Sequence, residues 1–327
     1  MINRRFLLVF AGLTALFAAQ QAVAQGPLAL DATKLKLASA NVLVLDAADH
    51  RPIYAKGADN VTPIASLTKL MTAVVTLDAG LSLDDPIAID MDDFDYLKGS
   101  HSRLRMGAEL PRREMLRLAL MASENRAASS LARHYPGGTP AFVAAMNAKA
   151  QSLGMTRTHY SDPTGLSAQN VSTASDLATL VATAATYPLI REFSTTQSHY
   201  VEVQPTGQML GFNNTNALVK NADWDIQVSK TGFIREAGKC LVMMATISSR
   251  PVVIVLLDSL GRYTRIADAV RVKYWLETGE SMPVRTAVKA TKAAKPGTKG
   301  AGVKGTLPGK PSQVSAVSAK TSKARRA

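Results

Sequence analysis

Residues 65–78 have the sequence ASLTKLMTAVVTLD. From Ser66 to Asp78 the apolar side chains return at short intervals, at Leu67, Leu70, Met71, Val74, Val75 and Leu77. This spacing predicts a buried helix, which Gly80 would end. The same stretch opens with Ser66-Leu67-Thr68-Lys69. A spacing of three residues on a helix brings the serine hydroxyl and the lysine amine within reach of each other.

Around this helix the chain alternates between short apolar runs and longer helical patterns. We expect strands at 40–45, 52–55, 200–203, 226–230, 240–247 and 252–257, and further helices at 114–134, 141–153, 173–185 and 262–277. The residues Ser-Asp-Pro-Thr-Gly at 161–165 predict a turn. Strands at both ends with helices between them predict an α+β domain, in which the first and last strands share one antiparallel sheet.

The first 24 residues have the pattern of a secretory signal peptide. Arg4 and Arg5 precede an apolar run from Phe6 to Ala19, and Ala22-Val23-Ala24 is a small-residue cleavage motif. We expect cleavage after Ala24 and a mature protein secreted to the periplasm, with an uncleaved N-terminal anchor as the alternative. The expected organisation is a signal peptide at 1–24, a folded domain at 25–284 and a tail at 285–327.

The formal net charge of +13 comes from the two ends of the chain. Residues 25–284 contain 25 basic and 25 acidic residues, whereas 285–327 contain 11 basic residues and no acidic residue. A neutral folded domain argues against a basic nucleic-acid-binding domain. The tail has almost no large apolar side chain, so we expect it to be disordered. It is either a solvated linker or an electrostatic tether to an anionic cell-envelope polymer or membrane surface.

Several familiar kinds of site are missing from the sequence. The single cysteine, Cys240, excludes a disulfide framework and a multi-cysteine zinc site. The five histidines lack the spacing of metal ligands, and neither a P-loop nor a dinucleotide-binding glycine motif occurs. We therefore expect no metal and no cofactor, and we interpret the aspartates of 90–95 as part of a solvated loop.

A serine hydroxyl needs a base before it can act as a nucleophile, and no histidine is placed to serve Ser66. Lys69 can be that base if its amine is neutral. Burial, the positive end of a helix dipole and a second nearby cation each lower the pKa of a lysine. All three influences are compatible with the position of Lys69 at the start of a buried helix.

Two further short motifs supply groups that suit such a site. Ser123-Glu124-Asn125 offers a second hydroxyl, which can carry a proton to a leaving amine, and an amide, which can hold a lysine or a substrate backbone group. Lys230-Thr231-Gly232 is expected to end the strand 226–230. Its lysine and threonine can bind a carboxylate, and its glycine permits close backbone approach. Each motif alone is weak, but the three in this order are specific.

The three motifs together resemble those of the penicillin-binding, serine DD-peptidase and β-lactamase family. The longer stretches 65–73, 161–166 and 230–233 are similar to the low-molecular-mass D-alanyl-D-alanine peptidases. Residues 123–128 and 238–243 most resemble the D-alanyl-D-alanine endopeptidases of the penicillin-binding protein 7 type. The resemblance covers about 35–280. It implies a β-lactamase/DD-peptidase-like α+β fold, with an antiparallel sheet flanked by helices and a helical subdomain.

The resemblance also implies an acyl-enzyme mechanism. Ser66 would attack a D-alanyl carbonyl of a peptidoglycan stem peptide with Lys69 as proton acceptor, and β-lactams would acylate the same serine as covalent inhibitors. The backbone N–H groups of Ser66 and Phe233 would form the oxyanion hole. Ser123 would relay a proton to the leaving amine, and Asn125 would orient Lys69 and the substrate. Substrate binding would fall to Lys230, Thr231 and Gly232.

Related activities have to be separated from one another. A class A β-lactamase needs a glutamate for its deacylating water, and neither Glu192 nor Glu202 lies in such a context. A carboxypeptidase of this family often carries a further β-rich domain, which is not expected here. The sequence therefore favours an endopeptidase that cleaves cross-links between stem peptides. A D-alanyl-D-alanine carboxypeptidase and a non-catalytic cell-wall-binding protein are the alternatives. Residues 101–104 are expected near the pocket, without an assigned role.

Overall fold

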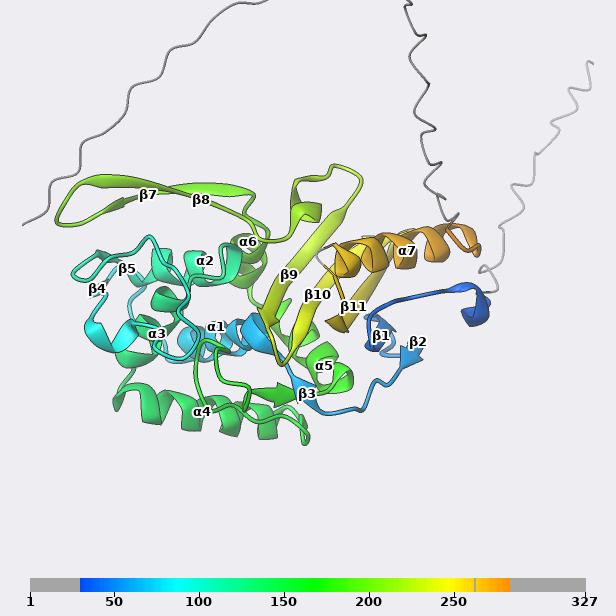
Figure 1. Cartoon of the computed structure of the whole chain (residues 1–327), viewed down its shortest axis with the longest axis horizontal. Coiled ribbons are helices and arrows are strands. Elements are labelled where there is room, and N and C mark those ends of the chain that lie inside the picture. The colour runs from blue at the N-terminus through cyan, green and yellow to red at the C-terminus, as the bar shows by residue number, and fades with distance from the viewer. Residues whose placement is uncertain (1–29, 262, 283–327) are drawn as a thin grey trace, which may run out of the picture. The chain divides into compact units, whose positions relative to one another are not determined.

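The computed structural model describes residues 30–261 and 263–282. At its centre lies a five-stranded antiparallel sheet in the order β2-β1-β11-β10-β9 (Figure 1). Its strands are β1 (Asn41–Asp46), β2 (Pro52–Lys56), β9 (Asp225–Ile234), β10 (Gly238–Ile247) and β11 (Arg250–Ser259). Val44 of β1 lies opposite Ile254 of β11. The prediction that the first and last strands share one antiparallel sheet is confirmed.

Helices cover both faces of this sheet. On one face lies α7 (Thr264–Thr278), and on the other lies α5 (Ala174–Ala184). A helical part adjoins the second face and contains α1 (Lys69–Asp78), α2 (Arg112–Met121), α3 (Asn125–Arg133), α4 (Gly138–Ser152) and α6 (Pro188–Thr195). The α+β class with a helical subdomain is thereby confirmed.

Short elements complete the described part of the chain. Three two-stranded sheets pair β3 (Thr62–Pro63) with β6 (Val171–Ser172), β4 (Pro86–Ala88) with β5 (Glu109–Pro111), and β7 (Ser198–Val203) with β8 (Gln208–Asn213). Single 3-10 turns occur at η1 (Ala32–Lys34), η2 (Ala65–Thr68), η3 (Met91–Asp93) and η4 (Ala217–Lys220).

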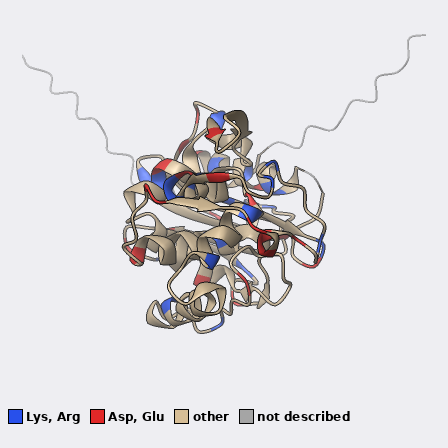
Figure 2. Ribbon diagram, turned by 90° about the vertical axis from the view of Figure 1, so that its left-hand side faces the viewer, with Lys and Arg blue, Asp and Glu red and all other residues tan. Residues whose placement is uncertain are grey.

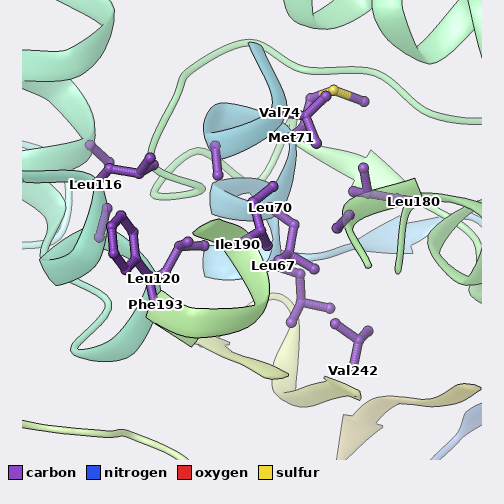
Figure 3. Packing of buried hydrophobic residues seen from close by; sticks show 14 of the residues in the cluster. Leu67, Leu70, Met71, Val74, Leu116, Leu120, Leu180, Ile190, Phe193 and Val242 are labelled. Carbon is purple, nitrogen blue, oxygen red and sulfur yellow. The ribbon is translucent and has the colours of Figure 1, made fainter. Parts of the chain in front are cut away.

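Successive side chains of β1 point to opposite faces of the sheet and so belong to two different parts of the core. Val42 and Val44 pack with α7, whereas Leu43 and Leu45 belong to the larger cluster on the other side. In that cluster Leu67, Leu70, Met71 and Val74 of η2 and α1 pack beside Leu116, Leu120, Ile190, Phe193 and Val242 (Figure 3). Burial of each such side chain stabilises the fold by about 1.5–3 kcal/mol relative to exposure. The start of α1 is therefore fixed against β10 and the helices around it.

The structure corrects three predicted elements. The helix expected at 114–134 is two helices, because Ser123 between them has a positive φ of 60° that interrupts the helical hydrogen bonds. The helix expected from Ser66 begins as the 3-10 turn η2, and α1 starts at Lys69. Lys230-Thr231-Gly232 lies inside β9 and not at its end, because pairing with β10 continues through Gly232 opposite Cys240.

Some predictions concern residues that the structure does not describe. The signal peptide at 1–24, its cleavage after Ala24 and the tail at 285–327 lie outside the described residues and stay predictions. Within 30–261 and 263–282, no helix is long and apolar enough to cross a membrane. Acidic and basic residues are interspersed over the described ribbon (Figure 2), as expected for a domain in which the two signs balance.

Candidate active site

Ser66 and Lys69 meet where η2 passes into α1. Ser66 lies within η2 and is partly exposed, whereas Lys69 is the first residue of α1 and is fully buried. The Lys69 Nζ atom is 3.0 Å from Ser66 Oγ. The structure thus brings the hydroxyl of a partly exposed serine into direct contact with a buried amine, at the spacing that the sequence predicted.

The other contacts of Lys69 fix the direction of its amine. Nζ donates to Asn125 Oδ1 at 2.7 Å and to the Thr164 carbonyl at 2.6 Å. A neutral amine has two N–H groups and one lone pair. Two acceptors already take the two N–H groups, so in the neutral state the lone pair remains for the Ser66 hydroxyl proton. This arrangement is what a general base needs.

Burial also favours the neutral state of Lys69. Removal of the amine from water lowers the pKa of Lys69 from 10.5 to about 7, and the negative charges of Asp162 and Glu124 act in the opposite direction. A substantial share of the amines is therefore neutral near pH 7. Of the three influences expected from the sequence, burial is the largest cause.

The second motif occupies the break between α2 and α3. Ser123 turns its hydroxyl toward Lys230, and Lys230 Nζ donates to Ser123 Oγ at 2.9 Å. Asn125 is the first residue of α3, where its amide accepts from Lys69 and donates to Ser100 Oγ at 2.8 Å. The positive φ of Ser123 turns the backbone within this short motif. The Ser123 hydroxyl can therefore contact Lys230 while the Asn125 amide contacts Lys69.

The third motif approaches from β9. Lys230 is almost fully buried, and burial together with the charges of Lys69 and Arg265 holds the pKa of Lys230 well below its usual range. Thr231 Oγ1 lies 2.7 Å from Thr215 Oγ1. A Cβ at Gly232 would lie 3.0 Å from the Ile64 carbonyl oxygen and 3.2 Å from the Ser66 backbone nitrogen, so glycine lets β9 run this close to η2 without crowding. Phe233 follows with an exposed side chain.

No functional role was predicted from the sequence for the loop 162–167, whose backbone carbonyls contact Lys69 and Thr72 of α1. Asp162 accepts hydrogen bonds from the backbone N–H groups of Thr164, Gly165 and Ser167. Asn170 accepts from the N–H of Asp162 and donates to Thr68 Oγ1 at 3.0 Å. These bonds hold the Thr164 carbonyl against Lys69. The turn was predicted, but its contact with Lys69 depends on an approach across 95 residues of sequence.

Metal and thiol chemistry find no support in the described residues. Within 30–261 and 263–282, no three His, Cys, Asp or Glu side chains gather as a metal ion would need. Cys240 is buried in β10, and burial raises the pKa of its thiol to about 11. A protonated, inaccessible thiol is a structural one.

The chain is similar in sequence to a known family and its members, and similar in fold to a solved structure. A sequence model of the family described as D-alanyl-D-alanine carboxypeptidase matches residues 28–261. The D-alanyl-D-alanine endopeptidase of Escherichia coli (strain K12) is 48% identical over 274 residues, which cover 84% of this chain and 88% of that protein. The protein of the same name from Pseudomonas aeruginosa is 51% identical over 255 residues, covering 78% and 82%. The crystal structure of the Streptomyces K15 DD-transpeptidase superposes with a TM-score of 0.70 at 28% identity, covering 74% and 98%.

A glycine substitution tests how tightly the loop at 162–167 supports Ser66. Gly165 has a positive φ, and a Cβ there would lie 2.0 Å from the Ala65 carbonyl oxygen. We expect Gly165→Ala to lower the free energy of unfolding by clearly more than the roughly 1–2 kcal/mol that left-handed backbone alone costs. Gly154→Ala is the matched control, because Gly154 has a similar φ of 72° and open space around it. Urea denaturation of both variants measures the difference, and equal losses would contradict the close packing.

Proposed function

The chain belongs to the D-alanyl-D-alanine carboxypeptidase family of serine peptidases, and from this membership we propose that it is a peptidoglycan D-alanyl-D-alanine endopeptidase acting through an acyl-enzyme on Ser66. The observation that carries the proposal is the contact of 3.0 Å between Lys69 Nζ and Ser66 Oγ, with both other contacts of the amine taken by carbonyl oxygens. A cell-wall-binding protein without turnover would have no use for a buried amine oriented in this way.

In the proposed acylation step Lys69 takes the hydroxyl proton as Ser66 Oγ attacks a D-alanyl carbonyl carbon. The negative charge that develops on the carbonyl oxygen is stabilised by the backbone N–H groups of Ser66 and Phe233. The close approach of Gly232 to the Ser66 nitrogen supports this assignment, because it brings the β9 backbone beside η2. The tetrahedral intermediate then loses the amine of the scissile bond, which leaves the peptide esterified to Ser66.

The leaving amine needs a proton, and we assign its delivery to Ser123. Its hydroxyl accepts a hydrogen bond from Lys230 Nζ, which leaves its own proton free to go to the leaving amine, and the proton that Lys69 took from Ser66 would then replace it. Lys230 and Thr231 bind the substrate carboxylate beside this point. The pKa of Lys230 is low in the free protein, and an entering carboxylate would raise it and form an ion pair. Asn125 holds Lys69 and the substrate in position, and water then hydrolyses the ester.

The choice between endopeptidase and carboxypeptidase rests on the similar proteins. The matching family model has the name of a carboxypeptidase, whereas relatives about half identical over most of their length have the name of an endopeptidase. The endopeptidase is therefore the more specific proposal, and the carboxypeptidase is the second candidate. Glu192 pairs with Arg117 and Glu202 contacts Gln204, so neither glutamate is placed to activate water at Ser66 as a β-lactamase requires.

The proposed substrate also sets the location and the partners. Stem peptides of peptidoglycan would be met in the periplasm, where the signal-peptide pattern of 1–24 would deliver the chain. β-Lactams would acylate Ser66 as substrate analogues. The binding of an anionic cell-envelope polymer by residues 285–327 rests on their positive charge alone.

The role of Lys69 predicts a pH dependence. The protonated amine cannot accept the Ser66 proton, so the rate constant for acylation by a fluorescent penicillin should rise through pH 7 and level off above it. Below that pH it should fall about tenfold per unit. Lys69→Ala should lower it at all pH values by about 10²–10⁴-fold, while Lys36→Ala, which removes an exposed lysine, should match the unsubstituted protein. A rate independent of pH between 6 and 8, or normal labelling of Lys69→Ala, would show that the base is a different group.

Digestion of purified muropeptides separates the two candidate reactions. We expect the pure protein to convert cross-linked dimers to monomers faster than it converts pentapeptides to tetrapeptides, as measured by chromatography of the products. Ser66→Ala should do neither and is the control for contaminating hydrolases. Trimming of pentapeptides with dimers left intact would establish the carboxypeptidase instead.

A further inference from the structure

A groove leads away from the candidate active site along β8. Its first part is a pocket of about 370 Å³, whose lining includes Arg103, Glu124, Phe212, Asn213 and Thr215. Its second part is a pocket of about 230 Å³ between the loop 103–108 and the β7–β8 hairpin. Arg103 lines both pockets, so the two are neighbours with Arg103 between them, and we refer to the pair as the groove. The hairpin lies along the edge of the helical part near α2 and β5 (Figure 1), where Glu109 pairs with Gln204.

The groove carries positive charge that the protein does not neutralise. Arg103 and Arg105 are exposed, and no carboxylate of the described residues forms an ion pair with either guanidinium. Arg103 is held in place, because it donates to the Gly211 carbonyl and lies 4.3 Å from the centroid of the Phe212 ring. Glu124, the one acidic residue that lines the two described pockets, is buried and accepts a hydrogen bond from Ser102.

The groove starts on the side from which the leaving group departs. In the proposed mechanism Ser123 protonates the leaving amine, and Lys230 joins Ser123 to β9. Thr231 follows Lys230 and contacts Thr215 at 2.7 Å, and Thr215 lines the first pocket. A free D-alanine leaving group would end at the Lys230 and Thr231 carboxylate site. The leaving half of a cross-link is a whole peptide with carboxylates, and it has to continue beyond that point.

We propose that Arg103 and Arg105 bind carboxylates of the peptide that leaves when a cross-link is cut, and so select cross-linked substrates over linear ones. The inference rests on the proposed function and adds the residues that would determine its specificity. Two exposed guanidinium groups suit this task. A guanidinium binds a carboxylate in planar, bidentate geometry, and its weak hydration keeps the desolvation cost of binding small. Arg103 is also oriented before binding, which reduces the ordering cost.

The test compares substrates that do and do not extend into the groove. For Arg103→Gln/Arg105→Gln we expect kcat/KM on a cross-linked dimer to fall about tenfold or more, chiefly through KM, while acylation by penicillin stays within about twofold. Arg103→Lys/Arg105→Lys should recover part of the loss. Arg51→Gln is the matched control, because Arg51 is an exposed arginine just before β2, at the opposite edge of the sheet from β9. A dimer amidated at every carboxylate of the leaving peptide except the one assigned to Lys230 and Thr231 should be cleaved equally by the double variant and the unsubstituted protein.

A binding measurement separates this inference from the proposed function. In the Ser66→Ala background, the dimer should bind at least several-fold more weakly when both arginines are glutamine, whether or not the protein turns the dimer over. Equal dimer affinity and equal dimer cleavage would overturn the groove assignment. The same loss with the amidated dimer would also overturn it, because carboxylates would then play no part. Failure of the unsubstituted protein to cleave any dimer would contradict the proposed endopeptidase, and the affinities would still decide the groove.

Discussion

The site depends on one buried amine and its three contacts. Lys69 Nζ contacts Ser66 of η2, Asn125 of α3 and the Thr164 carbonyl of the loop between α4 and β6, so three separate parts of the chain meet at a single nitrogen. Burial of a charged amine is costly in free energy. Burial therefore lowers the pKa of Lys69, and the neutral form becomes populated near pH 7. A buried amine that is partly neutral near pH 7 and directed at a hydroxyl is what the proposed acylation of Ser66 requires of its base.

Local strain around this nitrogen is supported by packing elsewhere. Ala65 and Ser123 both have positive φ values, of 49° and 60°, which residues with a side chain seldom adopt. Ala65 directly precedes Ser66, the proposed nucleophile, and Ser123 directs its hydroxyl at Lys230. The core that packs Leu67, Leu70 and their neighbours around η2 and α1 holds the first of these conformations (Figure 3). Packing in the core thus offsets the conformational cost of the positive φ at Ala65, next to the proposed site.

Much of this could be predicted from sequence, for identifiable reasons. Apolar spacing at 66–78 and the β-branched runs at both ends were enough to predict a central helix and a shared antiparallel sheet. The break at Ser123 was not predicted. Helices α2 and α3 both direct apolar residues such as Leu120 and Leu131 into one core, so the helical spacing of apolar residues continues across the break. The support by Asp162, Thr164 and Asn170 escaped because it consists of long-range contacts to backbone atoms, which leave no periodic signal. The groove at Arg103 depends on the β7–β8 hairpin, of which only part of one strand was expected.

The proposed mechanism requires Lys69 to be neutral in a substantial share of molecules near pH 7, before substrate binds. A titration of ¹³C-labelled lysine Cε by NMR, with the Lys69 signal assigned by its loss in Lys69→Arg, measures this state directly and without substrate. We predict a midpoint near 7, the value to which burial lowers the pKa of Lys69. A midpoint near 10.5, the ordinary pKa of a lysine, would leave the amine protonated and Ser66 without its base.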